Sequence, residues 1–355
     1  AFDAKSLGYL TLCPMTEAPI LTLSHQLHQN LPVPHTLPSS ATSILEAAAI
    51  LRRGGLVAFP TETVYGLGAD ATNADAVAAI FEAKGRPAYN PLICHVANLA
   101  AAKRLGEFDA RAEKLAQAFW PGALTLIVKR TSDCPAAAAV SAGLDSIAIR
   151  VPDHELALSL LVETDRPLAA PSANRSGAVS PTSAGHVAQS LGDNVDLILD
   201  GGNCRVGVES TVLAVDGATP VLLRPGGITI EDLRKVVGPI ELAEIGDTDQ
   251  PKSPGMLESH YAPNLAVRMN AHTATPDEAV LAFGPVLPEN LNAALNLSPD
   301  GNLDQAAANL FDYLRALDQD NYTGIAVMPI PDHGIGRAIN DRLRRAAAPR
   351  PSRPE

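Results

Sequence analysis

The sequence predicts an α/β protein in two parts: a twisted, open, mixed sheet covered by helices, and a smaller C-terminal α/β domain. Three observations predict this class. From Ser43 onward, short apolar runs alternate with helix-like segments, as in sheets whose faces are covered by helices. Of the 355 residues, 46% are apolar, which is enough for a sizeable core. A turn-rich segment at 241–264 separates a second, shorter run of strands and helices.

The first part begins with a helix at 43–55 that is closed by glycines, followed by a strand at 56–61. A second helix at 73–85 has Asn73 as its N-cap, and Gly85 suits a left-handed exit. The same patterns predict further strands at 91–96, 123–129, 146–152, 168–174, 195–202, 210–215 and 221–227. They predict further helices at 109–120, 154–163, 180–192 and 229–237.

The second part contains strand patterns at 265–269, 279–284 and 324–330, and helix patterns at 303–319 and after residue 336. We therefore divide the chain into five segments. These are a flexible N-terminal arm at 1–40, a main domain at 41–240, a linker at 241–264, a small C-terminal domain at 265–347, and a disordered tail at 348–355. The chain begins with Ala1, and Met15 is a candidate natural start.

Charge and cysteine content restrict the class of function. The formal net charge of −12 argues against tight binding of nucleic acid, because binding to the phosphate backbone depends on lysine and arginine density. The four cysteines lie far apart without a CxxC, which gives neither a structural zinc motif nor a disulfide framework. We expect a cytoplasmic protein. No apolar run reaches the roughly 18 residues of a membrane span, so we expect no membrane association.

Common nucleotide and catalytic motifs are absent from the sequence. It contains no GxxxxGK[ST], no GxGxxG after a strand, no GxSxG and no HExxH. His25, His28 and His35 lie in the N-terminal arm and are expected to be solvated, so we predict no metal site. A nucleotide, if one binds, must be held outside the common phosphate-binding loops.

Polar side chains gather instead at the ends of predicted strands, in turns rich in glycine and proline. They are Thr61, Glu62, Thr63, Lys84, Arg86, Asn90, Arg150, Ser172, Asn174, Ser210 and Arg224, with His95 inside a strand. In open α/β sheets, ligands bind in a crevice at the strand ends. We therefore expect these side chains to converge on one site.

Each residue also has an ordinary structural explanation. Lys84 can complement the dipole at a helix C-terminus, Ser180 can be an N-cap, and His95 can be a core histidine. Arg150 and Arg224 are harder to explain in this way, because an arginine that ends an apolar strand usually has an anionic partner. Since we expect no carboxylates lining the site to match them, the cations favour a polyanionic substrate such as a triphosphate.

The order of the motifs is specific. KGR at 84–86 followed by SAN at 172–174 matches the KxR…SxN signature of the YrdC-like family, and FPTETVYGLG, ESTV and LRPGG resemble its other motifs. SPGMLESHYAP and GIGRAINDRLRRAA resemble the linker and the C-terminal end of its two-domain members, the threonylcarbamoyl-AMP synthases. The resemblance covers residues 40–347 and implies a YrdC-like domain followed by a Rossmann-like one.

This resemblance implies a nucleotidyltransferase that converts L-threonine, bicarbonate and ATP into L-threonylcarbamoyladenylate and pyrophosphate. The product serves the threonylcarbamoyladenosine modification of tRNA next to the anticodon. It also implies that Mg²⁺ arrives with ATP, and that the adenylate passes to a tRNA threonylcarbamoyl-transfer complex. No stable binding of nucleic acid to this chain is expected.

The resemblance also implies roles for individual residues. The residues that hold threonine are Thr63, His95, Arg150 and Ser210. The residues that hold ATP are Arg86, Asn90, Ser146, Ser172, Asn174, Ser180, Arg224 and His260. Lys84 and Arg86 are the implied catalytic residues, with Lys84 neutralising charge that develops at the phosphates. His260 lies in the linker, which would act as a lid that excludes water.

Two alternatives belong to other classes of function. The carbamoyl-transfer domain of hydrogenase-maturation proteins belongs to the same superfamily, but those proteins carry CxxC motifs and an acylphosphatase-like segment that this sequence lacks. An RNA-binding module would use a basic cleft. The acidic net charge and the 4% aromatic content weigh against it.

Overall fold

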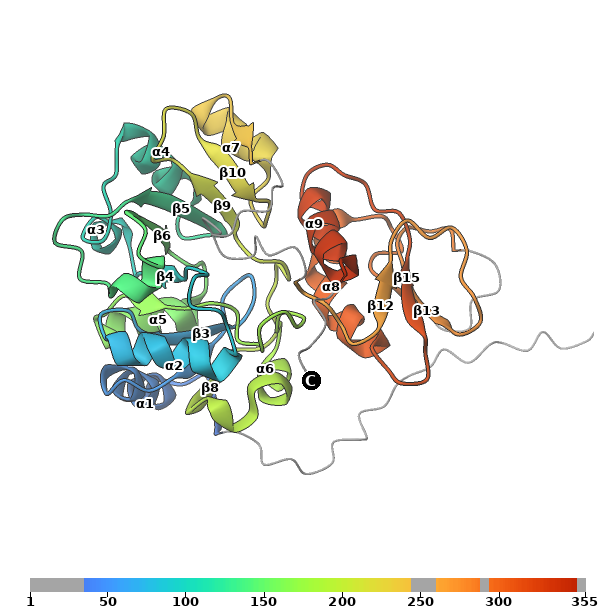
Figure 1. Cartoon of the computed structure of the whole chain (residues 1–355), viewed down its shortest axis with the longest axis horizontal. Coiled ribbons are helices and arrows are strands. Elements are labelled where there is room, and N and C mark those ends of the chain that lie inside the picture. The colour runs from blue at the N-terminus through green and yellow to red at the C-terminus, as the bar shows by residue number, and fades with distance from the viewer. Residues whose placement is uncertain (1–34, 244–259, 288–293, 350–355) are drawn as a thin grey trace, which may run out of the picture. The chain divides into compact units, whose positions relative to one another are not determined.

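The structure is a computed structural model that describes residues 35–243, 260–287 and 294–349 (Figure 1). The predictions of a flexible arm over residues 1–34, of the linker over 244–259, and of a disordered tail over 350–355 lie outside the described residues. Among the described helices, none is long and apolar enough to cross a membrane.

The larger domain is built on an eleven-stranded sheet whose strand order is β1-β8-β2-β3-β7-β4-β6-β5-β9-β10-β11. Its strands are β1 (Thr36–Pro38), β2 (Val57–Phe59), β3 (Gly66–Asp70), β4 (Ile93–His95), β5 (Leu124–Lys129), β6 (Ser146–Arg150), β7 (Leu168–Ala169), β8 (Leu197–Asp200), β9 (Thr211–Ala214), β10 (Val221–Arg224) and β11 (Glu241–Leu242). The helices packed with this sheet are α1 (Ala41–Arg52), α2 (Ala74–Lys84), α3 (Leu99–Ala102), α4 (Ala110–Phe119), α5 (Glu155–Thr164), α6 (Ala184–Leu191) and α7 (Ile230–Val237).

The sheet is mixed, as predicted. Strand β4 runs parallel to β6, and β5 runs parallel to β9, whereas β5 and β6 are antiparallel. Both edge strands are short and pair in parallel, β1 with β8 and β11 with β10. Because the sheet contains both parallel and antiparallel pairs, the carboxyl ends of its strands do not all lie at one edge.

The two faces of the sheet have different surroundings, since side chains alternate along a strand. On one face, Cys94, Leu126 and Ile149 belong to the main core, with α2, α4, α6 and α7 packed over it. On the other face, Ile93, Ile127 and the small side chains beside them form only a small cluster. Helices α1 and α5 cover that second face over β2, β8 and β7. A part of the sheet face over β4, β6, β5 and β9 is therefore left without a covering helix among the described residues.

Helix α2 shows why these segments form where they do. The Asn73 side chain accepts hydrogen bonds from the backbone N–H groups of Asp75 and Ala76, which satisfies free donors of the first turn. Gly85 ends the helix at φ +60°, a left-handed conformation that glycine adopts without strain. The exit through Gly85 sets the direction of the chain into Arg86.

The C-terminal domain has a four-stranded parallel sheet of order β12-β15-β13-β14, formed by β12 (Ala266–Arg268), β13 (Glu278–Ala282), β14 (Ala294–Asn296) and β15 (Gly324–Val327). Helices α8 (Leu303–Leu317) and α9 (Gly336–Ala347) lie beside these strands (Figure 1). Leu310, Phe311 and Leu343 are central to its core. That core also includes Val64, Val179 and Val208 from loops of the larger domain, so the two domains share one apolar cluster.

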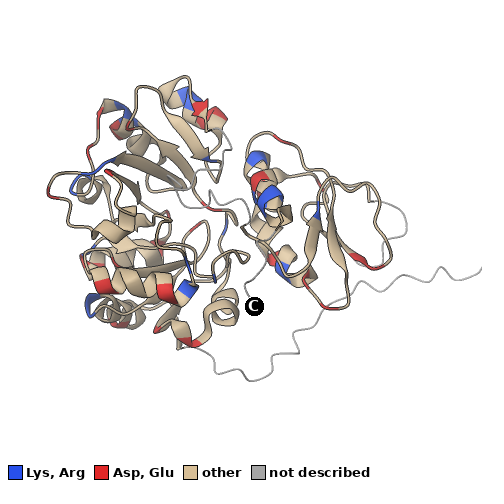
Figure 2. Cartoon of the chain, viewed as in Figure 1, with Lys and Arg blue, Asp and Glu red and all other residues tan. Residues whose placement is uncertain are grey.

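The predicted fold class is confirmed: a mixed, helix-covered sheet followed by a smaller α/β domain. The structure adds four strands that the sequence patterns did not predict, β1, β3, β11 and β14. Strand β3 contains Gly66 and Gly68, which we had read as part of a turn. Charges of both signs are interspersed on helices of both domains, including α7 and α9 (Figure 2).

Candidate active site

A pocket lies on the uncovered sheet face and collects eight of the predicted site residues. Those that line it are Thr63, Arg86, His95, Arg150, Ser172, Ser210, Arg224 and His260. The lining also includes Thr61, which was expected to converge here without a specific role, and seven residues that were not predicted, namely Val64, Gly66, Ile93, Ala170, Pro171, Glu209 and Tyr261. Residues from eight separate stretches of sequence therefore meet in one cavity.

The alternation of side chains along the strands explains this convergence. His95 shares its face of β4 with Ile93, and Arg150 is its neighbour in the register with β6. Ser210 precedes β9 and Arg224 ends β10, on strands that are antiparallel to each other. His95 and Arg150 end β4 and β6 and pair with each other, and Arg224 ends β10 opposite Val212 of β9. The expected convergence of strand-end residues is therefore confirmed for His95, Arg150, Ser210 and Arg224, which all line the pocket.

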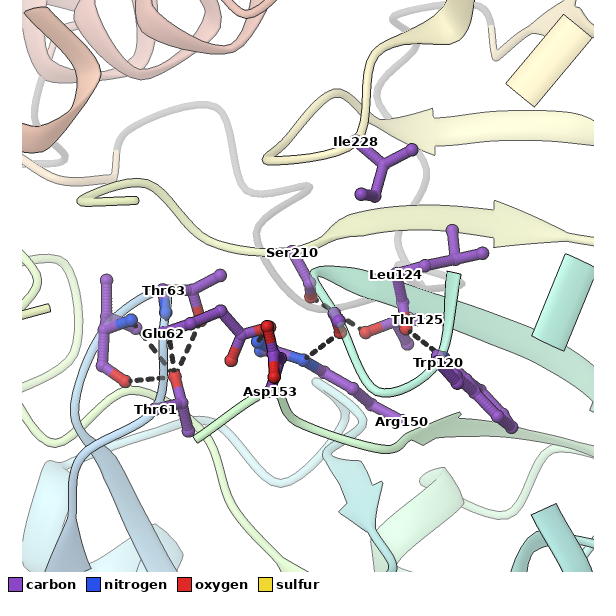
Figure 3. A network of polar contacts seen from close by, with 12 residues as sticks. Thr61, Glu62, Thr63, Trp120, Leu124, Thr125, Arg150, Asp153, Ser210 and Ile228 are labelled. Carbon is purple, nitrogen blue, oxygen red and sulfur yellow. Dashed lines mark hydrogen bonds and ion pairs between the residues drawn. The ribbon is translucent and has the colours of Figure 1, made fainter. Parts of the chain in front are cut away.

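Arg150 is held by contacts on two sides. Its Nη2 lies 2.7 Å from Oε1 of Glu62, and its Nε donates to the Gly122 carbonyl at 3.2 Å. Figure 3 shows the guanidinium directed at the Glu62 carboxylate. Both side chains are almost fully buried, with 4% and 1% of their area exposed. A buried pair of this kind fixes the orientation of the guanidinium, since each charge is costly to leave alone.

Hydroxyl groups and a neutral imidazole surround Arg150. The Thr61 and Thr63 hydroxyls lie 2.8 Å apart, and the Ser210 hydroxyl lies 2.8 Å from that of Thr125 (Figure 3). Burial, reinforced by the charge of Arg150, lowers the pKa of His95 to about 3. At neutral pH this part of the pocket therefore offers one strong cation among neutral hydrogen-bonding groups.

A second group of cations lies beside it. Arg86 and Arg224 are 8% and 4% exposed, and both line the pocket. Burial lowers the pKa of Arg86 to about 10 and also lowers that of Arg224. Each of these cations adds to the cost of charging the other. An anion bound between the two guanidinium groups would offset both costs, so the electrostatics favour a polyanionic ligand.

Lys84 has a different position from the one its implied role suggests. Its ammonium group donates to the carbonyl oxygens of Ser172 and Asn174, and it does not line the pocket. Burial, followed by the nearby charge of Arg86, lowers the pKa of Lys84. In this geometry Lys84 ties the end of α2 to the SAN segment, and so fixes the loop on which Ser172 stands.

The other predicted ATP residues stand behind or beside the pocket. Asn90 is fully buried, and neither atom of its side-chain amide has a hydrogen-bond partner among the described residues. Asn174 donates to the carbonyls of Arg175 and Ala178. Ser180 donates to Glu209 at 2.5 Å. Ser146 lines a separate cleft together with Lys129 and Asp145, so the structure does not bring it into the pocket.

Two carboxylates lie among these cations: Glu62, which was in the group of strand-end residues expected to converge, and Glu209, which was not. Glu62 pairs with Arg150, and Glu209 lines the pocket immediately before Ser210. The expectation that the cations lack matching carboxylates is therefore wrong. Both glutamates stand in motifs that were singled out, FPTETVYGLG and ESTV, so the motifs themselves carried the signal.

Two family models match the chain in succession. One, described as "Telomere recombination", matches residues 49–226, and the other, described as "Threonylcarbamoyl-AMP synthase, C-terminal domain", matches residues 228–348. Together they span both sheets of the structure.

Similar proteins match over most of their own length. A threonylcarbamoyl-AMP synthase of Bacillus subtilis is 44% identical, over 88% of this chain and 95% of the relative. One of Pyrococcus abyssi is 42% identical, over 85% and 93%. The crystal structure of P. abyssi Sua5 complexed with L-threonine superposes with a TM-score of 0.82 at 38% identity, covering 89% of this chain and 97% of that one. The chain belongs to the threonylcarbamoyl-AMP synthase family, in its two-domain form.

Proposed function

We propose that the pocket on the uncovered sheet face is where this chain forms threonylcarbamoyl-AMP, with L-threonine and ATP side by side. The observation that carries this proposal is the division of the pocket into two halves. One half has Arg150 among hydroxyls and the neutral His95, and the other has Arg86 and Arg224. An amino acid needs one cation for its carboxylate, and a triphosphate needs several.

In the first half, Arg150 binds the carboxylate of threonine. Glu62 and the Gly122 carbonyl hold Nη2 and Nε of its guanidinium, which leaves the Nη1 edge for the substrate. Thr63 and Ser210 supply hydroxyls at hydrogen-bonding range of the amino acid. His95 stays uncharged at neutral pH and so does not repel the substrate's ammonium group.

In the second half, Arg86 and Arg224 bind the phosphates of ATP, and Ser172 supports them from the loop that Lys84 fixes. His260 lines the same pocket and adds an uncharged wall, because burial lowers its pKa to about 3. Asn174 and Ser180 contribute through the loops they stabilise, and the buried amide of Asn90 keeps its proposed role in ATP binding. We propose that the charge of Lys84 helps to offset the negative charge of the phosphates without a direct contact, since it also acts electrostatically on His260.

The reaction then needs positioning and fixed positive charge more than a covalent nucleophile. The threonine amine combines with bicarbonate to give an N-carboxylate and water. An oxygen of that carboxylate attacks the α-phosphorus of ATP, the bond to the bridging oxygen breaks, and pyrophosphate leaves with the electron pair. Arg86 and Arg224 stabilise the negative charge that builds up on the leaving group.

Magnesium is proposed to enter as part of the ATP substrate. Among the described residues, no three His, Cys, Asp or Glu side chains are grouped so that they could hold a metal ion. We therefore assign no step to a protein-bound metal. We further propose that the chain works in the cytoplasm and passes its adenylate to a tRNA threonylcarbamoyl-transfer complex.

The test is direct synthesis. Purified full-length chain is incubated with MgATP, L-threonine and bicarbonate, and the mixture is analysed by mass spectrometry for threonylcarbamoyladenylate and in parallel for pyrophosphate. We expect both products in equal amounts, and neither without threonine. Pyrophosphate without the adenylate would refute the proposal, as would the adenylate forming equally well with an Arg86→Ala, Arg150→Ala double variant.

A further inference from the structure

A residue of the C-terminal domain reaches the edge of the pocket. Arg342 stands on α9, and its side chain is fully buried. Its Nε lies 2.7 Å from Oε2 of Glu209, and its Nη1 lies 2.6 Å from Asp341 and 2.9 Å from the Pro225 carbonyl. The guanidinium also lies over the Tyr261 ring, with Cζ 5.1 Å from the centroid. Arg342 lies in the GIGRAINDRLRRAA motif, but no role was predicted for it.

Its partner Glu209 is a carboxylate inside a pocket that must accept a triphosphate. Glu209 is 6% exposed and lines the pocket, and both of its oxygens have donors, Ser180 on Oε1 and Arg342 on Oε2. Although burial opposes its ionisation, the charges of Arg342 and Arg224 and the Ser180 hydrogen bond together hold the pKa of Glu209 below its usual value. The group is therefore charged at neutral pH, close to where phosphates would lie.

Arg224 is the other cation that acts on Glu209. In the structure Arg224 donates to the Ser210 carbonyl at 2.9 Å and to the Ser210 hydroxyl at 3.2 Å, and it lines the pocket. If Glu209 lost Arg342, the nearest compensating charge would be Arg224. A carboxylate that captures Arg224 takes a cation from the phosphates and adds a repelling charge beside them.

We propose that Arg342 is a positioning residue for ATP: it occupies and neutralises Glu209, so that this carboxylate neither repels the phosphates nor competes with them for Arg224. The inference rests on the proposed function of the pocket. It gives the C-terminal domain a specific part in the site, since one arginine of α9 sets the charge balance where the triphosphate binds.

Four full-length variants test this. Arg342→Met removes the charge and keeps much of the volume, Arg342→Lys keeps the charge, Glu209→Gln removes the carboxylate charge, and the fourth combines Arg342→Met with Glu209→Gln. Each is measured for the Kd of a non-hydrolysable ATP analogue, for KM of ATP and of threonine, and for Tm. Arg337→Met is the matched control, because Arg337 stands on the same helix, pairs with the exposed Glu231 at 3.4 Å across the domains, and is not among the residues that line the pocket.

We expect Arg342→Met to raise the Kd of the analogue and the KM of ATP at least about tenfold, and the KM of threonine less than about threefold. Glu209→Gln alone should not raise the Kd above that of the parent, because it removes the carboxylate charge that would repel the phosphates. The combined variant should return close to the parent Kd. Arg342→Lys should recover much of the ATP affinity even where its Tm is lowered, and Arg337→Met should leave the Kd unchanged.

A purely structural role gives a different pattern, in which Glu209→Gln weakens ATP as much as Arg342→Met and the combined variant is no better than either. That pattern overturns the inference, as does unchanged ATP affinity in Arg342→Met. If Arg342→Met does not fold, the combined variant decides: parent-like Kd supports the proposal, and a tenfold weaker Kd refutes it. Failure of the parent chain to make the adenylate counts against the proposed function alone, since the Kd comparison does not depend on turnover.

Discussion

At the scale of single residues, Arg150 should control threonine and not ATP. We expect Arg150→Ala to raise the KM of threonine at least about tenfold and the KM of ATP less than about threefold, because Arg150 acts on Glu62 and His95, whereas Arg224 acts on Arg86. Initial rates of pyrophosphate release give both values. Arg52→Ala on the exposed part of α1 is the control. An equal loss for both substrates would show that the assignment of the two halves is wrong.

The two buried histidines make stability depend on pH. Burial lowers the pKa of both His95 and His260 to about 3, whereas an unfolded histidine titrates near its ordinary value. The unfolded chain therefore binds more protons below about pH 6.5, so this part of the folding free energy is present above that pH and is lost as pH falls towards 3. Between pH 7 and 5 we expect a loss of about 2 kcal/mol for each histidine.

Urea unfolding at pH 7 and pH 5 checks this. In His95→Gln the difference between the two pH values should shrink by about 2 kcal/mol, whatever the absolute stability of the variant. The exposed His272 gives the control, and His272→Gln should show the pH dependence of the parent chain. A His95→Gln variant with undiminished pH dependence would mean that His95 takes up its proton in the folded chain as readily as in the unfolded one.

At the scale of elements, the end of α2 determines where Arg86 enters the pocket. Gly85 has φ +60°, and a Cβ there would meet nothing within 4 Å, so the cost of any side chain is that of the backbone conformation alone. We expect Gly85→Ala to lower the free energy of unfolding by about 1 kcal/mol. Gly85→Asn should cost less, because asparagine adopts this conformation more readily. Chemical denaturation of both variants measures the difference, and equal costs would contradict the explanation.

Helix α2 was predictable because its signals are local. Asn73 and Gly85 stand at its ends and act on backbone groups a few residues away. Strand β3 was missed because Gly66 and Gly68 resemble a turn when read alone, and only pairing with β2 and β7 makes the segment a strand. Strand β1 was likewise assigned to the arm, because its three residues become a strand only by pairing with β8.

The site was predictable in its residue types and less so in its contacts. Arginines at strand ends pointed to an anionic ligand, and eight of the predicted residues meet in the pocket. The sequence does not show that Glu62 faces Arg150 or that Arg342 reaches Glu209, because these contacts join residues far apart in the chain. Burial turns them into strong pairs, and burial follows from the packing of the whole chain. The predicted domain boundaries stay predictions.

At the scale of the molecule, the C-terminal domain completes the pocket. Val64, Val179 and Val208 share its core, and Arg342 pairs with Glu209. We expect a chain that ends at residue 243, which retains all eleven strands of the larger sheet, to fold but to bind ATP at least about tenfold more weakly. Circular dichroism and calorimetry with an ATP analogue test this. Full ATP affinity in the shortened chain would show that the pocket does not need the second domain.

The edges of the large sheet have a consequence for behaviour at high concentration. The outer strands of an open sheet can pair with strands from another molecule, and among the described residues the outer strands of the large sheet are β1 and β11. Here β1 has three residues and ends in Pro38, which has no N–H to offer, and β11 has only two residues. Such short borders make poor templates for intermolecular pairing, so the chain should stay monodisperse on concentration and resist forming fibrils.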